Sequence, residues 1–287
     1  CELVLEEYLD RIALLRRMLS HSDSLCQPSP RFLDSLDADE DYWVDTMGQS
    51  LRRYVHEPYR RKLAIIRHRL LTDLARVRAR IEGEHGELPQ GYVLSNVHAR
   101  KGEADLYLIR DSLMSHGDAN AARGPLQDLI RLAESFGYHL VHLDLRQEST
   151  RHTQAVTELF FRQPGAPYYQ AFSEEQKLLA LAEAVAHPHP FHIDKATLTA
   201  ETRETLEVFE VMARMRAEVS PDVFGEYVIS MTHTASHVME VMLLARLAGL
   251  AGRDHQGWFC DIRISPLFET IQDLAHIDRV MTRLLDD

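Results

Sequence analysis

The chain has 287 residues, of which 45% are hydrophobic and 26% charged, with 13 Gly and 11 Pro. This composition is typical of a globular protein and excludes the collagen-like, low-complexity and largely disordered classes. With 32 Lys and Arg against 44 Asp and Glu the net charge is −12, which disfavours nucleic-acid binding as the main function. No stretch approaches the roughly 18 to 20 apolar residues that a membrane-spanning helix needs.

Three cysteines, Cys1, Cys26 and Cys260, lie far apart, and none belongs to a C-x-x-C pair. Free thiols are typical of a reducing compartment, so we expect a cytoplasmic protein without a disulfide framework or a zinc knuckle. The chain opens within a helical pattern and shows no basic or apolar leader. That start indicates a piece of something longer.

The first half of the chain has the periodicity of helices. Leucine, isoleucine and tyrosine recur at helical spacing, with arginine and glutamate between them. A polar stretch, 20–41, interrupts the pattern, and a Gly- and Pro-bearing loop is expected over 82–91. The predicted helices span 2–19, 50–82, about 103–115 and about 125–136.

The second half contains three short apolar runs, Leu140–Leu145, Tyr227–Met231 and Ile262–Leu267. Each is followed by polar residues and then by a helical pattern, which predicts β-α units in a parallel sheet. Further helices are expected at about 173–186 and 200–217. Ser236 is a candidate N-cap for the helix after the second run, and Gly249 is expected to end that helix.

These elements predict an α/β fold that is mostly helical. Three strands are too few for a closed barrel, so we expect a partial (β/α) TIM-type barrel with about three parallel strands and many extra helices. We expect a helical region over 1–136 and a β/α barrel segment over 137–287 that carries part of the active-site rim.

The most informative polar residues follow the first predicted strand. If that strand ends at Leu145, Arg146–Glu148 lie just past its C-terminal end, where ligands bind in parallel α/β folds. The planar fork of Arg146 suits a carboxylate or a phosphate. Arg151 and His152 follow near the start of the next helix, whose dipole also favours an anion. The alternative is a structural arginine paired with a buried glutamate.

Glu269 takes the equivalent place after the third predicted strand, and Thr270 can cap the helix behind it. A rim carboxylate can ligate Mg²⁺ or Mn²⁺, which take oxygen ligands, or it can serve as a salt-bridge partner. Thr232, His233 and Ser236 form no nucleophile–base–acid arrangement. The histidines of 187–192 alternate with prolines, which favours a loop over a metal site.

These segments resemble the phosphoenolpyruvate carboxylase family. The strand-and-loop sequence FGYHLVHLDLRQESTRHT over 136–153 is similar to a family signature, as are EYVISMTHTASHVMEVMLL over 226–244 and ISPLFETIQDL over 264–274. Glu57–Arg60 matches the family's E-P-Y-R, and Leu106–Gly117 resembles a later helix. The motifs follow the family's order over most of the chain. Family members are several-fold longer, and their histidine motif and Gly-Arg-rich loop are absent here.

The resemblance implies a segment of a carboxy-lyase that forms oxaloacetate and phosphate from phosphoenolpyruvate and bicarbonate. It implies a Mg²⁺ or Mn²⁺ cofactor, TIM-barrel architecture, carbon dioxide fixation in the cytoplasm, and a tetramer of the full-length chain. We expect the isolated segment to be inactive and to bind a divalent metal weakly. The alternative is a non-catalytic helical scaffold or regulatory protein derived from the same fold.

The resemblance also assigns residues. Arg146 is expected to be catalytic and to face the phosphate or the developing enolate. Glu269 is expected to be one metal-ligating carboxylate, whose partner aspartate lies in a motif that this sequence lacks. Gln147, Glu148, Arg151 and His152 are expected to bind substrate or to hold Arg146 and the adjoining helix in place. His237 departs from the family, which has aspartate there; a changed salt bridge at the rim is the expected consequence.

Overall fold

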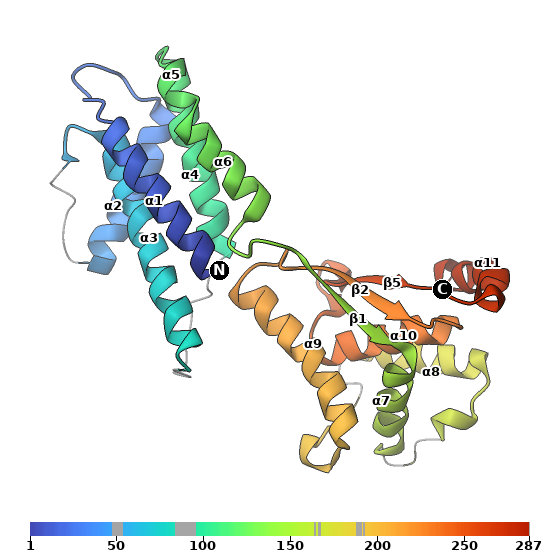
Figure 1. Ribbon diagram of the computed structural model, residues 1–287. Coiled ribbons are helices and arrows are strands. Elements are labelled where there is room, and N and C mark those ends of the chain that lie inside the picture. The colour runs from blue at the N-terminus through green and yellow to red at the C-terminus, as the bar shows by residue number, and fades with distance from the viewer. Residues whose placement is uncertain are drawn as a thin grey trace. The chain divides into compact units, whose positions relative to one another are not determined.

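The computed structural model describes residues 1–47, 54–83, 96–163, 165, 168–187, 191 and 193–286. The chain divides into two compact units, one made of Cys1–Val141 with Ala217–Ser220 and the other of His142–Arg216 with Pro221–Asp287. We call them the helical unit and the sheet unit; the first is drawn from blue to green in Figure 1. None of the described helices is long and apolar enough to cross a membrane.

The helical unit is a bundle of helices. Its elements are α1 (Glu2–Met18), α2 (Pro30–Met47), α3 (Pro58–Ile81), α4 (Asn96–Ser115), the single turn α5 (Ala119–Ala122) and α6 (Pro125–Phe136). Pro58 and Pro125 stand in the first turns of α3 and α6, where a missing N–H costs nothing. The predicted helices 2–19 and 125–136 match the observed bounds of α1 and α6 almost residue for residue.

The predicted break over 20–41 is wrong in its second half, because α2 begins at Pro30. Phe32 and Leu36, one turn apart, are both 0% exposed, so a helical stripe is present but is flanked by acidic residues that obscured it. The start predicted at 50 lies outside the described residues, as does most of the predicted loop 82–91. The described part of that helix begins at Pro58.

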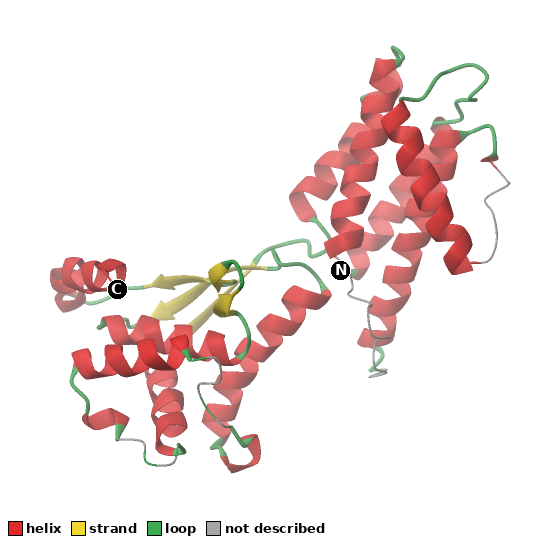
Figure 2. Cartoon of the chain, turned by 180° about the vertical axis from the view of Figure 1, so that it is seen from behind, coloured by secondary structure: helices red, strands yellow, loops and turns green. Residues whose placement is uncertain are grey.

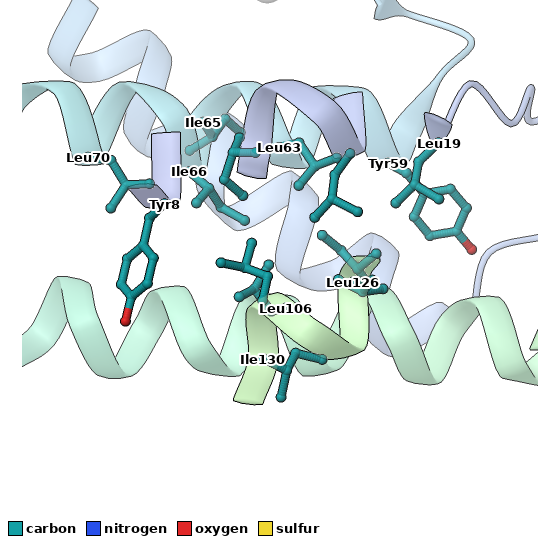
Figure 3. Close-up of a cluster of buried hydrophobic side chains, with 14 of the residues drawn as sticks. Tyr8, Leu19, Tyr59, Leu63, Ile65, Ile66, Leu70, Leu106, Leu126 and Ile130 are labelled. Atoms are coloured by element: carbon teal, nitrogen blue, oxygen red, sulfur yellow. The ribbon is translucent and has the colours of Figure 1, made fainter. Parts of the chain in front are cut away.

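The core of the helical unit lies between α1, α3, α4 and α6. Figure 3 shows side chains of α3, among them Leu63 and Ile66, pointing towards Leu106 of α4 and Ile130 of α6. All four side chains are at most 4% exposed. Burial of such aliphatic side chains stabilises the fold by about 1.5–3 kcal/mol each, so this packing holds the bundle together.

Four buried charged residues form a closed network in the same bundle. Lys62 Nζ lies 2.6 Å from Asp39 Oδ2 and 2.8 Å from Asp105 Oδ1. The guanidinium of Arg69 reaches the other oxygen of each carboxylate, at 2.7 Å from Asp39 and 2.9 Å from Asp105. Two positive and two negative groups thus alternate, and we call these four residues the buried charge cluster.

The sheet unit alternates strands and helices. Its first elements are β1 (Leu143–Glu148), α7 (Ser149–Phe161), the 3₁₀ turn η2 (Tyr169–Ala171), α8 (Glu174–Ala186), the 3₁₀ turn η3 (Lys195–Thr197) and α9 (Ala200–Glu218). There follow β2 (Phe224–Ser230), α10 (Ala235–Leu247), β3 (Ala251–Asp254), β4 (Gly257–Cys260), β5 (Arg263–Pro266) and α11 (Ile271–Asp286).

Strands β1, β2 and β5 form a parallel sheet with β2 in the centre, which confirms three parallel strands in a mostly helical α/β fold. Helices α7, α8 and α10 lie on one face of this sheet, as both views show (Figures 1 and 2). Tyr227 and Ile229 of β2 point to the helices and are fully buried. The alternation of strand side chains places Arg146 and Glu226 on the other face.

The first strand lies three residues later than predicted. Leu140 has a left-handed backbone (φ 71°) and belongs to the turn after α6, whereas Arg146, Gln147 and Glu148 pair in register with β2. Only alternate side chains of β1 face the helices, so polar residues can belong to the strand. The end of the apolar run therefore does not mark the end of the strand. The prediction that Arg146 follows the strand is therefore wrong, because it lies within it.

Two local features of the sheet unit also differ from expectation. The hairpin of β3 and β4 was not predicted, although Asp254 Oδ1 accepts hydrogen bonds from the N–H groups of Gln256 and Gly257 in its turn. The N-cap of α10 is Thr234 and not Ser236. Gly249 (φ 77°) does follow the C-cap residue of α10, as predicted.

Candidate active-site rim

The C-terminal ends of the three parallel strands converge at one edge of the sheet. Arg146, Gln147 and Glu148 form the last three positions of β1. Met231 follows β2 directly, and Glu269 lies between β5 and α11. Parallel pairing alone brings these segments together, since each strand ends at the same edge. We call this edge the rim.

The two residues predicted to carry the chemistry meet at the rim. Arg146 Nη2 donates a hydrogen bond to Glu269 Oε1 at 2.6 Å, although the residues are 123 positions apart in sequence. The Arg146 side chain is 60% exposed and that of Glu269 is 32% exposed. The pair is open to solvent, so an incoming anion or cation can reach either group. This exposure argues against the alternative of an arginine held by a buried glutamate.

The second carboxylate oxygen of Glu269 is held by the main chain. The N–H of Met231 donates to Glu269 Oε2 at 3.0 Å. Met231 has a left-handed backbone (φ 55°), which is uncommon for a residue other than glycine. On the other side of the same residue, the Ser149 hydroxyl donates to the Met231 carbonyl oxygen at 2.7 Å.

Gln147 and His152 are linked behind the rim through a buried tyrosine. The Tyr227 hydroxyl donates to Gln147 Oε1 at 2.8 Å and lies 2.8 Å from His152 Nε2. Because that hydroxyl has one proton, the Nε2–H of His152 is the donor in the second bond. Burial, with the neighbouring His237, lowers the pKa of His152 to about 3, so its ring is neutral at pH 7.

Glu148 and Arg151 lie at the surface near Arg146. Glu148 is exposed and occupies the N-cap position of α7, without a side-chain capping bond. Arg151 turns to α9, where Nη1 lies 3.6 Å from Glu204 Oε2, and both side chains are about half exposed or more. The structure thus brings Glu148 to the rim and pairs Arg151 with Glu204.

The N-terminus of α10 is occupied by an internal carboxylate. Glu174, in the first turn of α8, accepts the N–H of Ser236 and its hydroxyl, each at 2.8 Å. A carboxylate here neutralises the positive end of the helix dipole. The N-terminus of α7 also lies at the rim and has no side-chain cap. The N–H groups of its first turn can therefore attract an anion.

Two histidines lie near the N-terminus of α10: His233 precedes the helix and His237 is in its first turn. His233 Nδ1 is 2.7 Å from Asp273 Oδ1, and the Thr270 hydroxyl bonds the other oxygen of Asp273 at 2.7 Å. The N–H of Asp273 donates to Thr270 Oγ1, which confirms Thr270 as the cap of α11. Burial lowers the pKa of His237 to about 4, so at neutral pH it makes no salt bridge at the rim.

The described residues contain no group of three histidine, cysteine, aspartate or glutamate side chains that could hold a metal ion. Glu269 offers a solvent-accessible carboxylate at the rim, with oxygen lone pairs left beyond its two hydrogen bonds. Mg²⁺ and Mn²⁺ accept one or two carboxylates and complete their shells with water, so Glu269 fits one ligand of such a site. Of the histidine-bearing segment 187–192, for which a loop was expected, the structure describes His187 and Phe191; the other residues lie outside the described part of the chain.

Sequence reasoning overlooked Tyr227, Met231 and Ser149. Tyr227 could have been found from strand alternation, since it stands two positions from Ile229 on the helix-facing side of β2. Met231 carries no such signal, because its conformation is imposed by contacts from α7 and from the β5–α11 segment.

Comparisons with known proteins point to one family. The sequence model of the family described as phosphoenolpyruvate carboxylase matches residues 1–287. The chain is 33% identical to the phosphoenolpyruvate carboxylase of Parasynechococcus marenigrum over 99% of its own length, and 35% identical to that of Thermosynechococcus vestitus over 98%. The Synechocystis sp. enzyme is 34% identical over 98%. The chain spans only 29%, 28% and 27% of the lengths of these three relatives.

Proposed function

Because the chain belongs to the phosphoenolpyruvate carboxylase family, we propose that it supplies part of an active site that makes oxaloacetate and phosphate from phosphoenolpyruvate and bicarbonate. The observation that carries the proposal is the contact between Arg146 and Glu269 at the strand ends. Both residues stand in the segments that resemble the family's signatures, and the fold brings them within 2.6 Å of each other at a solvent-open edge.

Arg146 is proposed to bind the phosphate and to stabilise negative charge on the enol oxygen. In the reaction a bicarbonate oxygen attacks phosphorus, the bond from phosphorus to the enol oxygen breaks, and its electron pair stays on that oxygen. A fixed guanidinium beside that oxygen acts on charge that develops in the transition state. The C–O bond of carboxyphosphate to its phosphate group then breaks, which releases phosphate and CO₂, and the enolate carbon bonds to that CO₂.

Glu269 is proposed to be one ligand of a Mg²⁺ or Mn²⁺ ion. When bound, such an ion neutralises charge on phosphate and enolate oxygens. Gln147 and His152 support the strand that carries Arg146, through the buried Tyr227 hydroxyl. Glu148 and Arg151 are proposed to support the first turn of α7 or to contact substrate.

The proposal extends to the architecture and the setting of the longer protein. One face of the parallel sheet carries helices and the other carries charged side chains, which supports a share of a TIM-type barrel. We further propose that 1–136 and 137–287 act as separate domains, and that the full-length chain is a cytoplasmic tetramer. The three free cysteines fit a reducing compartment.

The test is oxaloacetate formation by the full-length protein that carries this segment, coupled to malate dehydrogenase. Arg146→Gln and Glu269→Gln should each lower kcat by about 100-fold or more, the scale of removing one transition-state contact. Arg263→Gln is the matched control, because Arg263 pairs with Glu226 at 2.9 Å at the opposite end of the same sheet. It should keep activity within about threefold, as expected for an exposed pair outside the site.

Other outcomes decide between the readings. An inactive full-length protein that folds normally would favour the non-catalytic scaffold. The isolated 287-residue chain should form no oxaloacetate, since the family's histidine and Gly-Arg-rich motifs are missing from it. Turnover by that chain would contradict the assignment of the remaining catalytic groups to absent sequence.

A further inference from the structure

We infer that Met231 is a positioning residue for Glu269, and that Ser149 holds Met231 in the conformation this requires. The inference rests on the proposed function, in which Glu269 is a metal ligand. Met231 acts through its main chain: its N–H is 3.0 Å from Glu269 Oε2, while Arg146 occupies Oε1. The carboxylate is therefore held at both oxygens by two different strand ends.

The backbone of Met231 has to be left-handed for this contact. A continued strand after Ser230 would alternate N–H directions along the ladder, whereas φ 55° turns the chain at residue 231. That conformation is unfavourable for a residue with a Cβ atom, and such residues concentrate at functional sites. They persist only where the surroundings over-determine them.

The surroundings of Met231 do over-determine it. Ser149, which is 1% exposed, bonds the Met231 carbonyl at 2.7 Å from the first turn of α7. The N–H of the next residue, Thr232, donates to the Leu267 carbonyl at 3.0 Å, and the Thr232 hydroxyl donates to the Ile229 carbonyl at 3.1 Å. Contacts from α7, from β2 and from the segment after β5 thus fix the turn, and the N–H of Met231 is left to donate to Glu269.

This arrangement explains why Ser149 and Glu269 belong to one site although they share no contact. The Ser149 hydroxyl fixes the carbonyl side of residue 231, and the N–H side of the same residue holds the carboxylate. Outer-shell partners of this kind orient a ligating carboxylate and are worth about 10- to 100-fold in metal affinity. Met231 contributes geometry, and its side chain takes no part.

The test is Mn²⁺ binding to the full-length protein, followed by electron paramagnetic resonance of free Mn²⁺, without turnover. Ser149→Ala should raise the Mn²⁺ dissociation constant about tenfold. Ser230→Ala is the matched control, since the Ser230 hydroxyl donates to the Gln147 carbonyl at 3.4 Å, whereas the Ser149 hydroxyl donates to the Met231 carbonyl. It should leave the constant within about twofold, the effect of one weak hydrogen bond.

Substitutions at residue 231 separate geometry from side-chain contact. Met231→Gly tolerates the left-handed backbone and should keep Mn²⁺ binding within about twofold, whereas the β-branched Met231→Val opposes it and should weaken binding about tenfold. In steady state, Ser149→Ala should raise the apparent KM for Mn²⁺ and leave kcat at saturating metal nearly unchanged.

The outcomes distinguish the inference from its premise. If Glu269→Gln leaves Mn²⁺ binding unchanged, the metal role of Glu269 fails and the inference fails with it. If Glu269→Gln weakens binding while Ser149→Ala lowers thermal stability and leaves Mn²⁺ affinity intact, only the inference is overturned. In that case the turn at Met231 serves the fold alone.

Discussion

The two units of the chain each contain a set of paired charges, and the sets differ in one respect. In the helical unit, Lys62 and Asp39 are at most 1% exposed in their side chains; in the sheet unit, Arg146 is 60% exposed. The chemical pairing is the same in both places, and the distances are equal at 2.6 Å. Exposure, and not pairing, separates a charge network that supports the fold from one that a ligand can enter.

Burial makes the charges of the helical unit dependent on each other. Burial raises the pKa of Asp105, and the adjoining Lys62 opposes that rise. Removing water from a charge costs several kcal/mol, which only the full set of partners offsets. At the exposed rim pair, water can solvate either charge when the other is removed, so the stability of the fold depends little on this contact.

The largest effect is expected when the buried charge cluster is broken. Asp39→Asn leaves Lys62 and Arg69 facing one carboxylate, and should lower the free energy of unfolding of the helical unit by about 3–5 kcal/mol. Urea unfolding followed by the fluorescence of Trp43 in α2 measures this, in a Trp258→Phe background that removes the other tryptophan. If Asp39→Asn lowers the free energy of unfolding by less than about 1 kcal/mol, the value of an exposed ion pair, the contrast between the buried and the exposed charges is wrong.

The control for that experiment lies in the same helix. Asp34→Asn makes the same chemical change at an exposed position of α2. Its effect on unfolding should stay within about 0.5 kcal/mol, as for most surface substitutions.

An intermediate effect is expected at a buried acid in the sheet unit. Glu240 is 0% exposed and accepts hydrogen bonds from Thr153 (2.7 Å) and Tyr169 (2.9 Å). Burial raises its pKa to about 7, so the folded state holds a proton that the unfolded state releases near pH 4.5. Stability should therefore fall as pH rises from about 4.5 to about 7, by up to about 3 kcal/mol.

Glu240→Gln should remove that loss. The variant should be more stable than the parent chain at pH 8 and close to it at pH 4.5, as measured by urea unfolding followed at Trp258 in β4. Equal pH dependence in both proteins would show that Glu240 is ionised in the fold. It would also show that the sheet unit tolerates a buried charge without the paired cations that the helical unit supplies.

The smallest effect is expected at the rim itself. Arg146→Gln removes a solvent-exposed pair and should change the free energy of unfolding of the sheet unit by less than about 1 kcal/mol. Trp258 fluorescence in urea reports the result. A loss above about 2 kcal/mol would make the Arg146–Glu269 pair structural, like the buried charge cluster.

The fold was predictable where the hydrophobic pattern within one segment is enough to identify its secondary structure. Helices α1 and α6 have apolar stripes that stand out from their neighbours, and parallel strands were indicated by apolar runs followed by helical patterns. Helix α2 was missed because, among its described side chains, the buried hydrophobic ones are Phe32 and Leu36, and the next buried residue is the charged Asp39. The end of β1 was misplaced because a strand with one open face continues through Arg146–Glu148.

The candidate site was predictable in its charged members and not in its supports. Arg146 and Glu269 could be proposed from strand ends and from family resemblance. The link from His152 through Tyr227 to Gln147 joins two strands and a helix, so no single segment contains it. The left-handed turn at Met231 depends on Ser149, 82 positions earlier in the chain.

The extension of β1 through Arg146 has an entropic consequence for ligand capture. A guanidinium on a loop would have to lose backbone freedom when an anion binds, at about 1–2 kcal/mol for each residue ordered. The main chain of Arg146 pairs with Val228 of the central strand, so that ordering is completed when the sheet forms. Only side-chain rotation remains to be restricted at the moment of binding, which leaves more of the electrostatic attraction available as affinity.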